Sequence, residues 1–353
     1  MSMAKQKGFS HTIPDGLDEK FKAGLPFALT PAQWQAVVQI REDMAASRPM
    51  LRLVQGDVGC GKTVVALYGC CVSLVNGKQA AIMAPTEILA RQHFKTITGF
   101  FGRAFSKARV ALLDSTLSKR ARKAVHDAVA RGDVDIVVGT HALIASEVAF
   151  KDLSYVVIDE QHKFGVKQRA LLSSKGKNPD VLVMTATPIP RTLCLTLYGD
   201  LDVSVIGEKP GGRGEIKTYH CVGEQAEGVY RRVAEWVGKG TQAYIVYPII
   251  EESEKADLKA AVDMYEHFRK NEFRDFRVGL VHGRLPRDEA RTIMDKFQAH
   301  EIDILVTTTV LEVGIDVPGA NVMVIEHAER FRGPPGGPRA PAPPLRPGPA
   351  GGS

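Results

Sequence analysis

A glycine-rich segment has the residue types and spacing of a phosphate-binding loop. The apolar run 51–54 predicts a buried strand, residues 56–63 match the pattern G-x-x-x-x-G-K-[ST], and residues 63–75 predict a helix. Glycines let backbone N–H groups surround an anion, and the helix N-terminus adds a partial positive charge. We expect Lys62 to reach the β- and γ-phosphates of a nucleotide and the Thr63 hydroxyl to bind Mg²⁺. The candidate nucleotide-binding residues of the loop are Gly56, Asp57, Val58, Gly59, Cys60, Gly61, Lys62 and Thr63.

Two acidic residues follow another predicted strand, about 100 residues after this loop. Residues 155–158 are apolar and deliver Asp159 and Glu160 to the carboxyl end of the strand, where open parallel sheets bind their ligands. Such a pair alone is more often a helix N-cap. After a phosphate loop, we expect Asp159 to hold Mg²⁺ opposite Thr63 and Glu160 to deprotonate the attacking water.

Two hydroxyl residues follow the predicted strand 181–184. We expect Thr185 and Thr187 to lie at the same sheet edge, to hydrogen-bond the acidic pair and to transmit the state of the γ-phosphate.

The elements that must position these residues alternate between strand and helix. Repeated βα units predict a parallel sheet covered by helices on both faces. A Thr30 N-cap with Pro31 in the first turn predicts a further helix before the loop. The expected strands are 51–54, 80–84, 110–113, 135–138, 154–158, 181–184, 216–221, 243–249, 277–281, 303–307 and 321–325. The expected helices are near 63–75, 87–101, 118–131, 167–173, 225–238, 255–271 and 286–299.

This alternation indicates two α/β domains of the parallel-sheet type with a nucleotide cleft between them. The predicted organisation is an irregular arm 1–26, a first domain 27–206, a linker 207–215, a second domain 216–331 and a disordered tail 332–353. No internal repeat is visible by sequence identity.

The overall composition is that of an ordinary globular protein. Of 353 residues, 44% are hydrophobic and 24% are charged, and neither a membrane span nor a signal peptide is visible, so a cytoplasmic location is expected. The net charge of +6 includes three arginines and no acid in the last 22 residues, which leaves a weak +3 that permits nucleic-acid binding without arguing for it. The five cysteines show no metal-ligand spacing and are expected to be reduced. Cys60 could have a lowered pKa at a helix N-terminus, although a small loop residue is the simpler interpretation.

Several segments together resemble the successive motifs of superfamily 2 helicases, and most closely those of the RecG family. The box Asp-Glu-Gln-His followed by F-G-V-x-Q-R discriminates best, because the transcription-repair coupling factor shares the loop and the T-A-T-P-I-P-R-T-L run but has a box that resembles D-E-E-Q-R-F-G-V. The matching segments are GDVGCGKT (56–63), APTEILARQHF (84–94), VVGTHALI (137–144), DEQHKFGVKQR (159–169), TATPIPRTL (185–193), GLVHGRL (279–285) and VTTTVLEVGIDVPGANVMVIEHAERF (306–331).

The resemblance implies two RecA-like domains, ATP and Mg²⁺ as cofactors, and a monomer that drives fork regression and branch migration on branched DNA, largely independently of sequence. It implies that Phe27 and Gln33 recognise adenine, and that Gln161 and His162 couple hydrolysis to movement. The implied DNA contacts are Pro85, Thr86, Glu87, Gly139, Thr140, His141 and Thr308, and the implied coupling residues of the second domain are Glu312, Gly314 and Asp316. Alternatively, His141 and His162 are hydrogen-bonded loop histidines, and Glu312 and Asp316 are solvated turn acids.

The sequence departs from the family pattern at both ends. An N-terminal wedge domain is not visible, and Phe331 is followed by Arg332-Gly333-Pro334-Pro335 in place of the family's arginine-bearing segment. Pro, Arg, Gly and Ala make up 20 of the last 22 residues, so we expect a truncated gene or a shifted reading frame after codon 331. A nucleotide sequence that encodes no arginine segment in any other frame would contradict this.

An arginine finger contributes about 10³–10⁵-fold to turnover, so weak hydrolysis is expected without one. Two alternatives to a RecG-type helicase stay open. One is a non-catalytic ATP- or DNA-binding remnant, and the other is a double-strand translocase that resembles the transcription-repair coupling factor.

Overall fold

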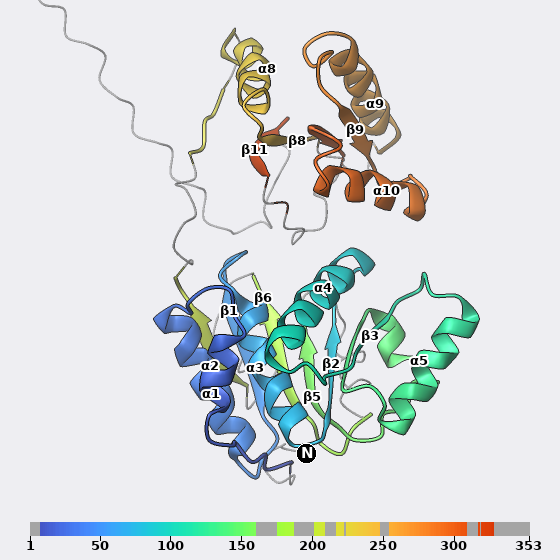
Figure 1. Ribbon diagram of the computed structural model, residues 1–353. Coiled ribbons are helices and arrows are strands. Elements are labelled where there is room, and N and C mark those ends of the chain that lie inside the picture. Colours follow the sequence, from blue (N-terminus) through green and yellow to red (C-terminus); the bar gives the residue numbers. More distant parts are fainter. Residues whose placement is uncertain are drawn as a thin grey trace, which may run out of the picture. The chain divides into compact units, whose positions relative to one another are not determined.

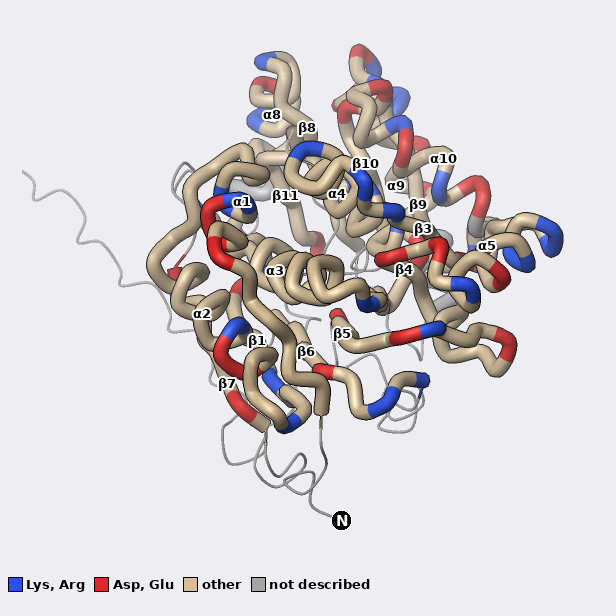
Figure 2. Tube along the Cα trace, turned by 60° about the horizontal axis from the view of Figure 1, so that its bottom comes forward, with Lys and Arg blue, Asp and Glu red and all other residues tan. Residues whose placement is uncertain are grey.

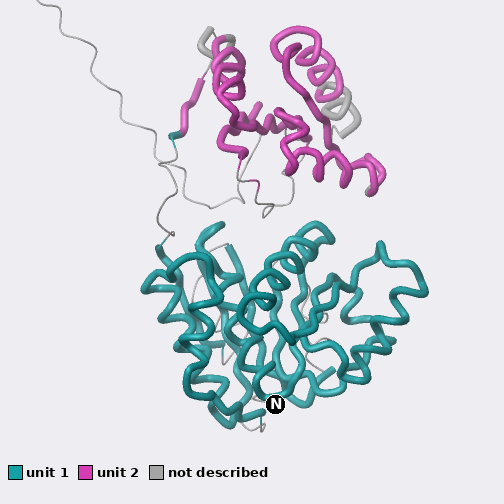
Figure 3. The backbone as a smooth tube through the Cα atoms, viewed as in Figure 1, with its two compact units in different colours: residues 1–217 teal, residues 218–353 magenta. Residues whose placement is uncertain are grey.

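The computed structural model of the chain forms two compact units, residues 1–217 and 218–353 (Figure 3). The structure describes residues 8–159, 175–186, 201–208, 217–221, 224–247, 254–308, 317 and 319–327. Each unit contains its own parallel sheet covered by helices, which confirms the predicted fold class (Figure 1). The nucleotide cleft between the units and the domain limits stay predictions, and the tail 332–353 lies outside the described residues.

The first unit is built on a seven-stranded sheet in the order β3-β4-β2-β5-β6-β1-β7, and every described strand pair is parallel. All six strands predicted in this region are present. The seventh, β7 (Asp202–Ile206), pairs with β1 and was not predicted, because its apolar run is short and half exposed. The other strands are β1 (Leu51–Gly56), β2 (Gln79–Met83), β3 (Val110–Leu113), β4 (Ile136–Gly139), β5 (Leu153–Ile158) and β6 (Asp180–Thr185).

Helices cover both faces of this sheet because successive residues of each strand point to opposite sides. One face packs against α1 to α4, and the other packs against α5 and the short 3₁₀ helix η2. The helices are α1 (Leu17–Ala23), α2 (Pro31–Ala45), α3 (Lys62–Val75), α4 (Glu87–Ala104), α5 (Lys119–Arg131) and η2 (His141–Ile144).

The start of α2 agrees with the prediction from sequence. Thr30 is the N-cap, its hydroxyl accepts a hydrogen bond from the Gln33 N–H, and the Gln33 side chain accepts one from the Thr30 N–H. This reciprocal pair satisfies two backbone N–H groups at the start of the helix that have no partner within it.

The prediction of an irregular arm before Phe27 is wrong for the described part of that segment. Residues 17–23 form α1, and its Leu17 and Phe21 are buried in the core. The helix is held because Asp18 accepts hydrogen bonds from Tyr68 of α3, at 2.6 Å, and from Arg41 of α2, at 2.5 Å. Seven residues carry too few apolar positions for a periodic pattern, which explains the error.

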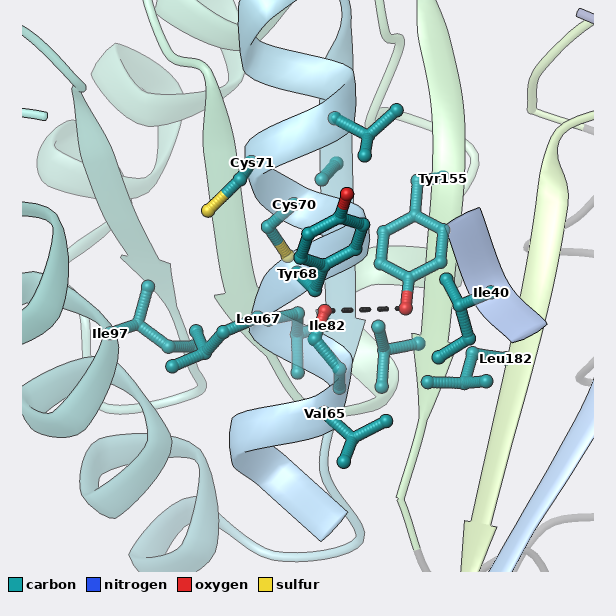
Figure 4. Close-up of a cluster of buried hydrophobic side chains, with 14 of the residues drawn as sticks. Ile40, Val65, Leu67, Tyr68, Cys70, Cys71, Ile82, Ile97, Tyr155 and Leu182 are labelled. Carbon is teal, nitrogen blue, oxygen red and sulfur yellow. Dashed lines mark hydrogen bonds between the residues drawn. The ribbon is translucent and has the colours of Figure 1, made fainter. Parts of the chain in front are cut away.

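The core beneath α3 depends on a close approach of this helix to β5 (Figure 4). Tyr155 lies fully buried under the helix, and its hydroxyl donates to the Ala66 carbonyl oxygen at 3.3 Å. A Cβ at Gly69 would overlap the Tyr155 ring, so only glycine fits there. Cys70 and Cys71 are buried free thiols in the same cluster.

The second unit contains a four-stranded parallel sheet in the order β11-β8-β10-β9. Helices α8 and α9 pack on one face and α10 packs on the other. Residues 217–221, which were expected to form a strand, are irregular in the structure. The elements are β8 (Gln242–Val246), β9 (Val278–Val281), β10 (Ile304–Thr307), β11 (Ala320–Ile325), α8 (Glu224–Val237), α9 (Glu254–Lys270) and α10 (Arg287–Gln298).

The two units share a hydrogen-bonding arrangement at the amino ends of their strands. In the first unit, Gln79 at the start of β2 donates to the carbonyl oxygens of Val129 and Val134. In the second, Gln242 at the start of β8 donates to those of Phe297 and Ile302.

An arginine and an aspartate reinforce the same edge in each unit. Arg109 before β3 pairs with Asp135 before β4, and its guanidinium also donates to the carbonyl oxygen of Gly132, the residue that follows α5. Arg277 and Asp303 repeat this pairing before β9 and β10. The structure therefore contains a repeat that sequence identity does not show.

Among the described helices, none is long and apolar enough to cross a membrane.

Candidate nucleotide site and nucleic-acid interface

The predicted site residues of the first unit gather at the carboxyl edge of its sheet. In the strand registers, Gln55 lies opposite Thr185, Ile158 lies opposite Val183, and Met83 lies opposite both Ile158 and Gly139. The segments that follow β4, β2, β5, β6 and β1 therefore leave the sheet side by side, in that order. Neighbouring strands lie about 4.8 Å apart, so residues from adjacent segments are within reach of one ligand.

The loop after β1 has a backbone that requires glycine. Gly59 and Gly61 have φ values of 76° and 89°, in the left-handed region that side chains disfavour. A Cβ at Gly56 would lie 2.5 Å from the Cys60 sulfur and 2.9 Å from the Ile206 carbonyl oxygen. Glycine at these positions is thus needed for the loop to close over the start of α3.

The ammonium group of Lys62 lies within this loop. Its Nζ donates to the carbonyl oxygens of Gly56, at 2.7 Å, and Asp57, at 3.1 Å, and the residue is buried. Thr63 is in the first turn of α3, and the Val58 N–H donates to the Asp57 carboxylate at 2.7 Å. A positive charge held among loop carbonyls at a helix N-terminus suits the binding of phosphate.

Cys60 is a structural residue of the loop. Its side chain is buried, and this burial raises the pKa of the thiol even though the nearby Lys62 charge opposes the shift. A raised pKa lowers the thiolate fraction, so the simpler interpretation of Cys60 as a small loop residue holds.

Helix α2 connects the loop to the predicted adenine-recognising residues. The Gln33 carboxamide is buried, and its nitrogen donates to the Cys60 carbonyl oxygen at 2.7 Å. Phe27 is 48% exposed and lines an open hollow of about 570 Å³ beside the start of α2, large enough for a nucleobase. The Lys22 ammonium covers the Trp34 ring in the wall of this hollow, at 3.6 Å from its centroid. Gln33 does not line the hollow, but its side chain joins the loop to Thr30 in the wall of the hollow by accepting from the Thr30 N–H.

Asp159 lies at the end of β5 and is held on two sides. Its N–H donates to the Met83 carbonyl oxygen at 2.9 Å, and its Oδ2 lies 2.7 Å from His93 Nε2, with both side chains buried. Its Oδ1 has no hydrogen-bond partner among the described residues. A carboxylate oxygen of Asp159 and the hydroxyl of the half-buried Thr63 at the same sheet edge fit Mg²⁺, which is usually held by one or two carboxylates, a hydroxyl and substrate phosphates.

Of the remaining residues predicted to lie at this edge, the structure describes only Thr185. Thr185 is fully buried at the end of β6, on the predicted edge. Glu160, Gln161, His162 and Thr187 lie outside the described residues.

The residues predicted to contact DNA in the first unit follow β2 and β4. Thr86 caps α4, its hydroxyl accepting from the Leu89 N–H, and it comes directly after Pro85. Glu87 accepts a hydrogen bond from the Ser115 hydroxyl, which ties α4 to the loop after β3. At the neighbouring strand end are Gly139, the buried Thr140 and the exposed His141.

Helix α5, next to this segment, is rich in basic residues that the sequence reasoning did not single out (Figure 2). Its N-terminal half and residues after η2 line a hollow of about 310 Å³. The charged or titratable residues in its lining are Lys119, Arg122, Lys123, His126 and Glu147. The signal was the composition of residues 119–131, which contain five cations and one acid.

His93 is a second residue that the reasoning missed. The buried side of α4 carries Leu89, Ala90, Ile97 and Phe100, and His93 is a polar residue in that apolar stripe. A polar residue at a buried helical position indicates a specific partner.

In the second unit, Thr308 follows β10 and is fully buried, with no partner for its hydroxyl among the described residues. Glu312, Gly314 and Asp316 lie outside the described residues.

Comparisons with known proteins identify the family. The family model described as DEAD/DEAH box helicase matches residues 30–195, and the helicase conserved C-terminal domain matches residues 228–334. The chain is 49% identical over 327 residues to the ATP-dependent DNA helicase RecG of Thermotoga maritima, covering 93% of the chain and 42% of that protein. The chain belongs to the RecG helicase family.

Other RecG proteins agree with this assignment. The RecG of Aquifex aeolicus is 51% identical over 324 residues, which cover 89% of the chain and 40% of that protein. A solved structure of RecG bound to a three-way DNA junction matches with a TM-score of 0.76 and 45% identity, over 92% of the chain and 42% of that structure. The chain therefore spans about two fifths of the length of these RecG relatives. The RecA-like character of both units is confirmed by these matches.

Proposed function

We propose that this chain binds ATP with Mg²⁺, hydrolyses it and uses the cycle to move on branched DNA, as a RecG-type helicase acting in repair and recombination. The observation that carries the proposal is the order of segments at one sheet edge: phosphate loop, Thr185, Asp159 and then the candidate DNA segments. The membership of this chain in the RecG family supports the same function. We propose that the protein acts as a cytoplasmic monomer.

The proposed division of labour combines the described geometry with the roles that the family resemblance implies. Lys62 neutralises the β- and γ-phosphates, and Phe27 and Gln33 hold the base. Thr63 and Asp159 hold Mg²⁺, which when bound neutralises charge on the phosphates. Glu160 deprotonates the attacking water, while Gln161, His162, Thr185 and Thr187 transmit the nucleotide state. In the second unit, Glu312, Gly314 and Asp316 couple to the nucleotide and Thr308 contacts DNA.

For DNA, we propose contacts to the phosphate backbone rather than to base edges. Pro85, Thr86 and Glu87 with Gly139, Thr140 and His141 present backbone groups and short polar side chains, and α5 adds cations beside them. Binding should therefore be largely independent of sequence and sensitive to salt.

The test is nucleotide binding and DNA-stimulated hydrolysis by the chain and its Lys62→Ala variant. We expect the variant to bind a fluorescent ATP analogue at least tenfold more weakly, and Lys177→Ala, an exposed lysine of the same unit, to bind it normally. Hydrolysis by the parent chain, although weak, should rise when a three-way junction is added. Equal nucleotide binding by the two variants, or hydrolysis unaffected by any DNA, would contradict the proposal.

A further inference from the structure

The contact between His93 and Asp159 connects helix α4 to the end of strand β5 at the carboxyl edge of the sheet. Asp159 ends β5, whereas His93 belongs to α4, the helix that follows β2. The 2.7 Å distance between Nε2 and Oδ2 is that of a strong charge-assisted hydrogen bond. Since an ionised carboxylate only accepts, the imidazole Nε2–H is the donor.

The bond uses one carboxylate oxygen and fixes the orientation of the other. The backbone of Asp159 is already held by Met83, so its side-chain torsions are the remaining freedom. A buried donor on Oδ2 restricts those torsions and directs Oδ1, the oxygen without a described partner, away from His93. Groups that orient a metal ligand in this way typically change metal affinity by about 10–100-fold when removed.

Helix α4 gives His93 a rigid connection to the candidate DNA segment. Thr86, the N-cap, precedes His93 by seven residues, so both lie on nearly the same face about 10 Å apart along the axis. Between and beyond them, Leu89, Ala90 and Ile97 are buried in the core. A displacement at the Thr86 end therefore moves His93 with the helix instead of being absorbed by bending.

We propose that His93 is a positioning residue that orients the metal-binding carboxylate of Asp159 and couples DNA contact at the start of α4 to the nucleotide site. This inference rests on the proposed function, in which Asp159 holds Mg²⁺ and Thr86 meets DNA. A DNA strand that moves α4 changes the position of the imidazole, and with it the direction of Oδ1. The simpler role for His93 is to fasten α4 to β5, and the two roles differ in what they do to Mg²⁺ dependence.

The test uses three variants of the whole chain that separate the hydrogen bond from packing. His93→Gln places an amide N–H near the position of Nε2 and keeps the donor. His93→Phe fills the same volume without a donor, and His93→Asn keeps an amide too short to reach Asp159. Ile97→Val, on the same buried face, is the matched control for reduced packing alone.

The readout is binding of a fluorescent ATP analogue during Mg²⁺ titration, with and without a three-way junction, which does not depend on turnover. We expect His93→Phe and His93→Asn to raise the Mg²⁺ midpoint about tenfold and to lose any change caused by the junction. We expect His93→Gln to stay within about threefold of the parent, and Ile97→Val to match it. Unfolding in urea, measured in parallel, reports how much each change costs in stability.

Two failures can be told apart. Suppose that the parent binds the analogue with a Mg²⁺ midpoint that Asp159→Asn abolishes. If His93→Phe and His93→Asn then keep the parent midpoint and the effect of the junction, His93 only holds α4 against β5 and the inference is wrong. If the parent chain shows no Mg²⁺-dependent nucleotide binding at all, the proposed function fails, and the inference fails with it.

Discussion

The side-chain nitrogen of Gln33 donates to the carbonyl oxygen of Cys60 at 2.7 Å, so helix α2 holds the phosphate loop from outside. The same carboxamide accepts from the Thr30 N–H, which means that one residue both caps its own helix and supports the loop. Gly61 lies against this side chain, and a Cβ there would overlap the carboxamide. The loop is thus shaped partly by a residue 27 positions away in sequence.

Replacing Gln33 should both loosen the loop and destabilise the fold. We expect Gln33→Ala to lower the free energy of unfolding by about 1–3 kcal/mol, because buried hydrogen-bonding groups lose a partner, and to weaken nucleotide binding severalfold. Urea unfolding and titration with a fluorescent ATP analogue measure the two effects. Gln35→Ala, an exposed glutamine on the same helix, is the control and should change neither.

The basic half of α5 should contribute to DNA affinity through charge. In Lys119→Ala combined with Lys123→Ala, we expect weaker binding to any duplex and a smaller slope of log K against log salt, by about 0.9 for each phosphate that the protein no longer neutralises. Fluorescence anisotropy at several salt concentrations measures this slope. Arg131→Ala is the control, since Arg131 lies at the far end of α5 and pairs with Asp133 at 2.7 Å. An unchanged slope in the double variant would exclude α5 from the interface.

Asp180 should make the first unit less stable as pH rises. It is buried at the start of β6, where it accepts from the Met50 N–H at 2.6 Å and lies 3.3 Å from the His11 ring. Burial raises the pKa of Asp180 to about 8, with a smaller contribution from the Asp43 charge, while burial lowers the pKa of His11. Near neutral pH the His11–Asp180 pair is therefore mainly uncharged.

The direction of this pH dependence follows from proton binding to Asp180 in the native state. Between the unfolded carboxyl pKa near 4 and the folded value of about 8, the native state holds the extra proton, so this contribution to stability is lost as pH rises through that range. We expect Asp180→Asn, which keeps the acceptor for Met50, to remove a slope of about 1 kcal/mol per pH unit between pH 6.5 and 8. In a Trp236→Phe background, fluorescence of Trp34 follows unfolding of the first unit alone, since the chain has two tryptophans. Parallel pH profiles for the aspartate and asparagine forms would contradict the raised pKa.

Two glycine substitutions should have opposite effects on stability. Gly69→Ala pushes a methyl group into the Tyr155 ring and should destabilise the first unit by about 1–3 kcal/mol. Gly102→Ala, in helix α4 with open space around it, should stabilise by about 0.5–1 kcal/mol, because alanine loses less backbone entropy. Urea unfolding of both variants tests the close packing of α3 on β5.

The sequence predicts the fold well where apolar runs are long and bounded by turn residues. The strands from β1 to β6 and the cap at Thr30 could be placed because each has a local signal. Helix α1 and strand β7 could not be placed. Helix α1 has only seven residues, about two turns, and β7 is defined by its pairing with β1 and not by a local signal. The run 217–221 has a strand-like composition but pairs with none of the described strands, so pairing rather than propensity decides such segments.

For the site, sequence predicts which residue types gather but not how they are held. The phosphate loop and Asp159 follow from spacing and strand order, and the structure places both at the predicted edge. The contacts of Gln33 with Cys60 and of His93 with Asp159 join residues 27 and 66 positions apart. No local pattern identifies such partners, because they depend on how helices pack across the sheet.

The hydrogen bonds shared by the two units, from Gln79 and Gln242 and between Arg109 and Asp135 or Arg277 and Asp303, lie at the amino ends of the strands. The candidate ligand-binding residues of the first unit lie at the opposite ends. Loops at the carboxyl edge can therefore change in sequence during evolution with little loss of folding stability, because the sheet is fastened elsewhere. The same set of bonds holds a seven-stranded and a four-stranded sheet, whatever residues stand at the carboxyl edge of each.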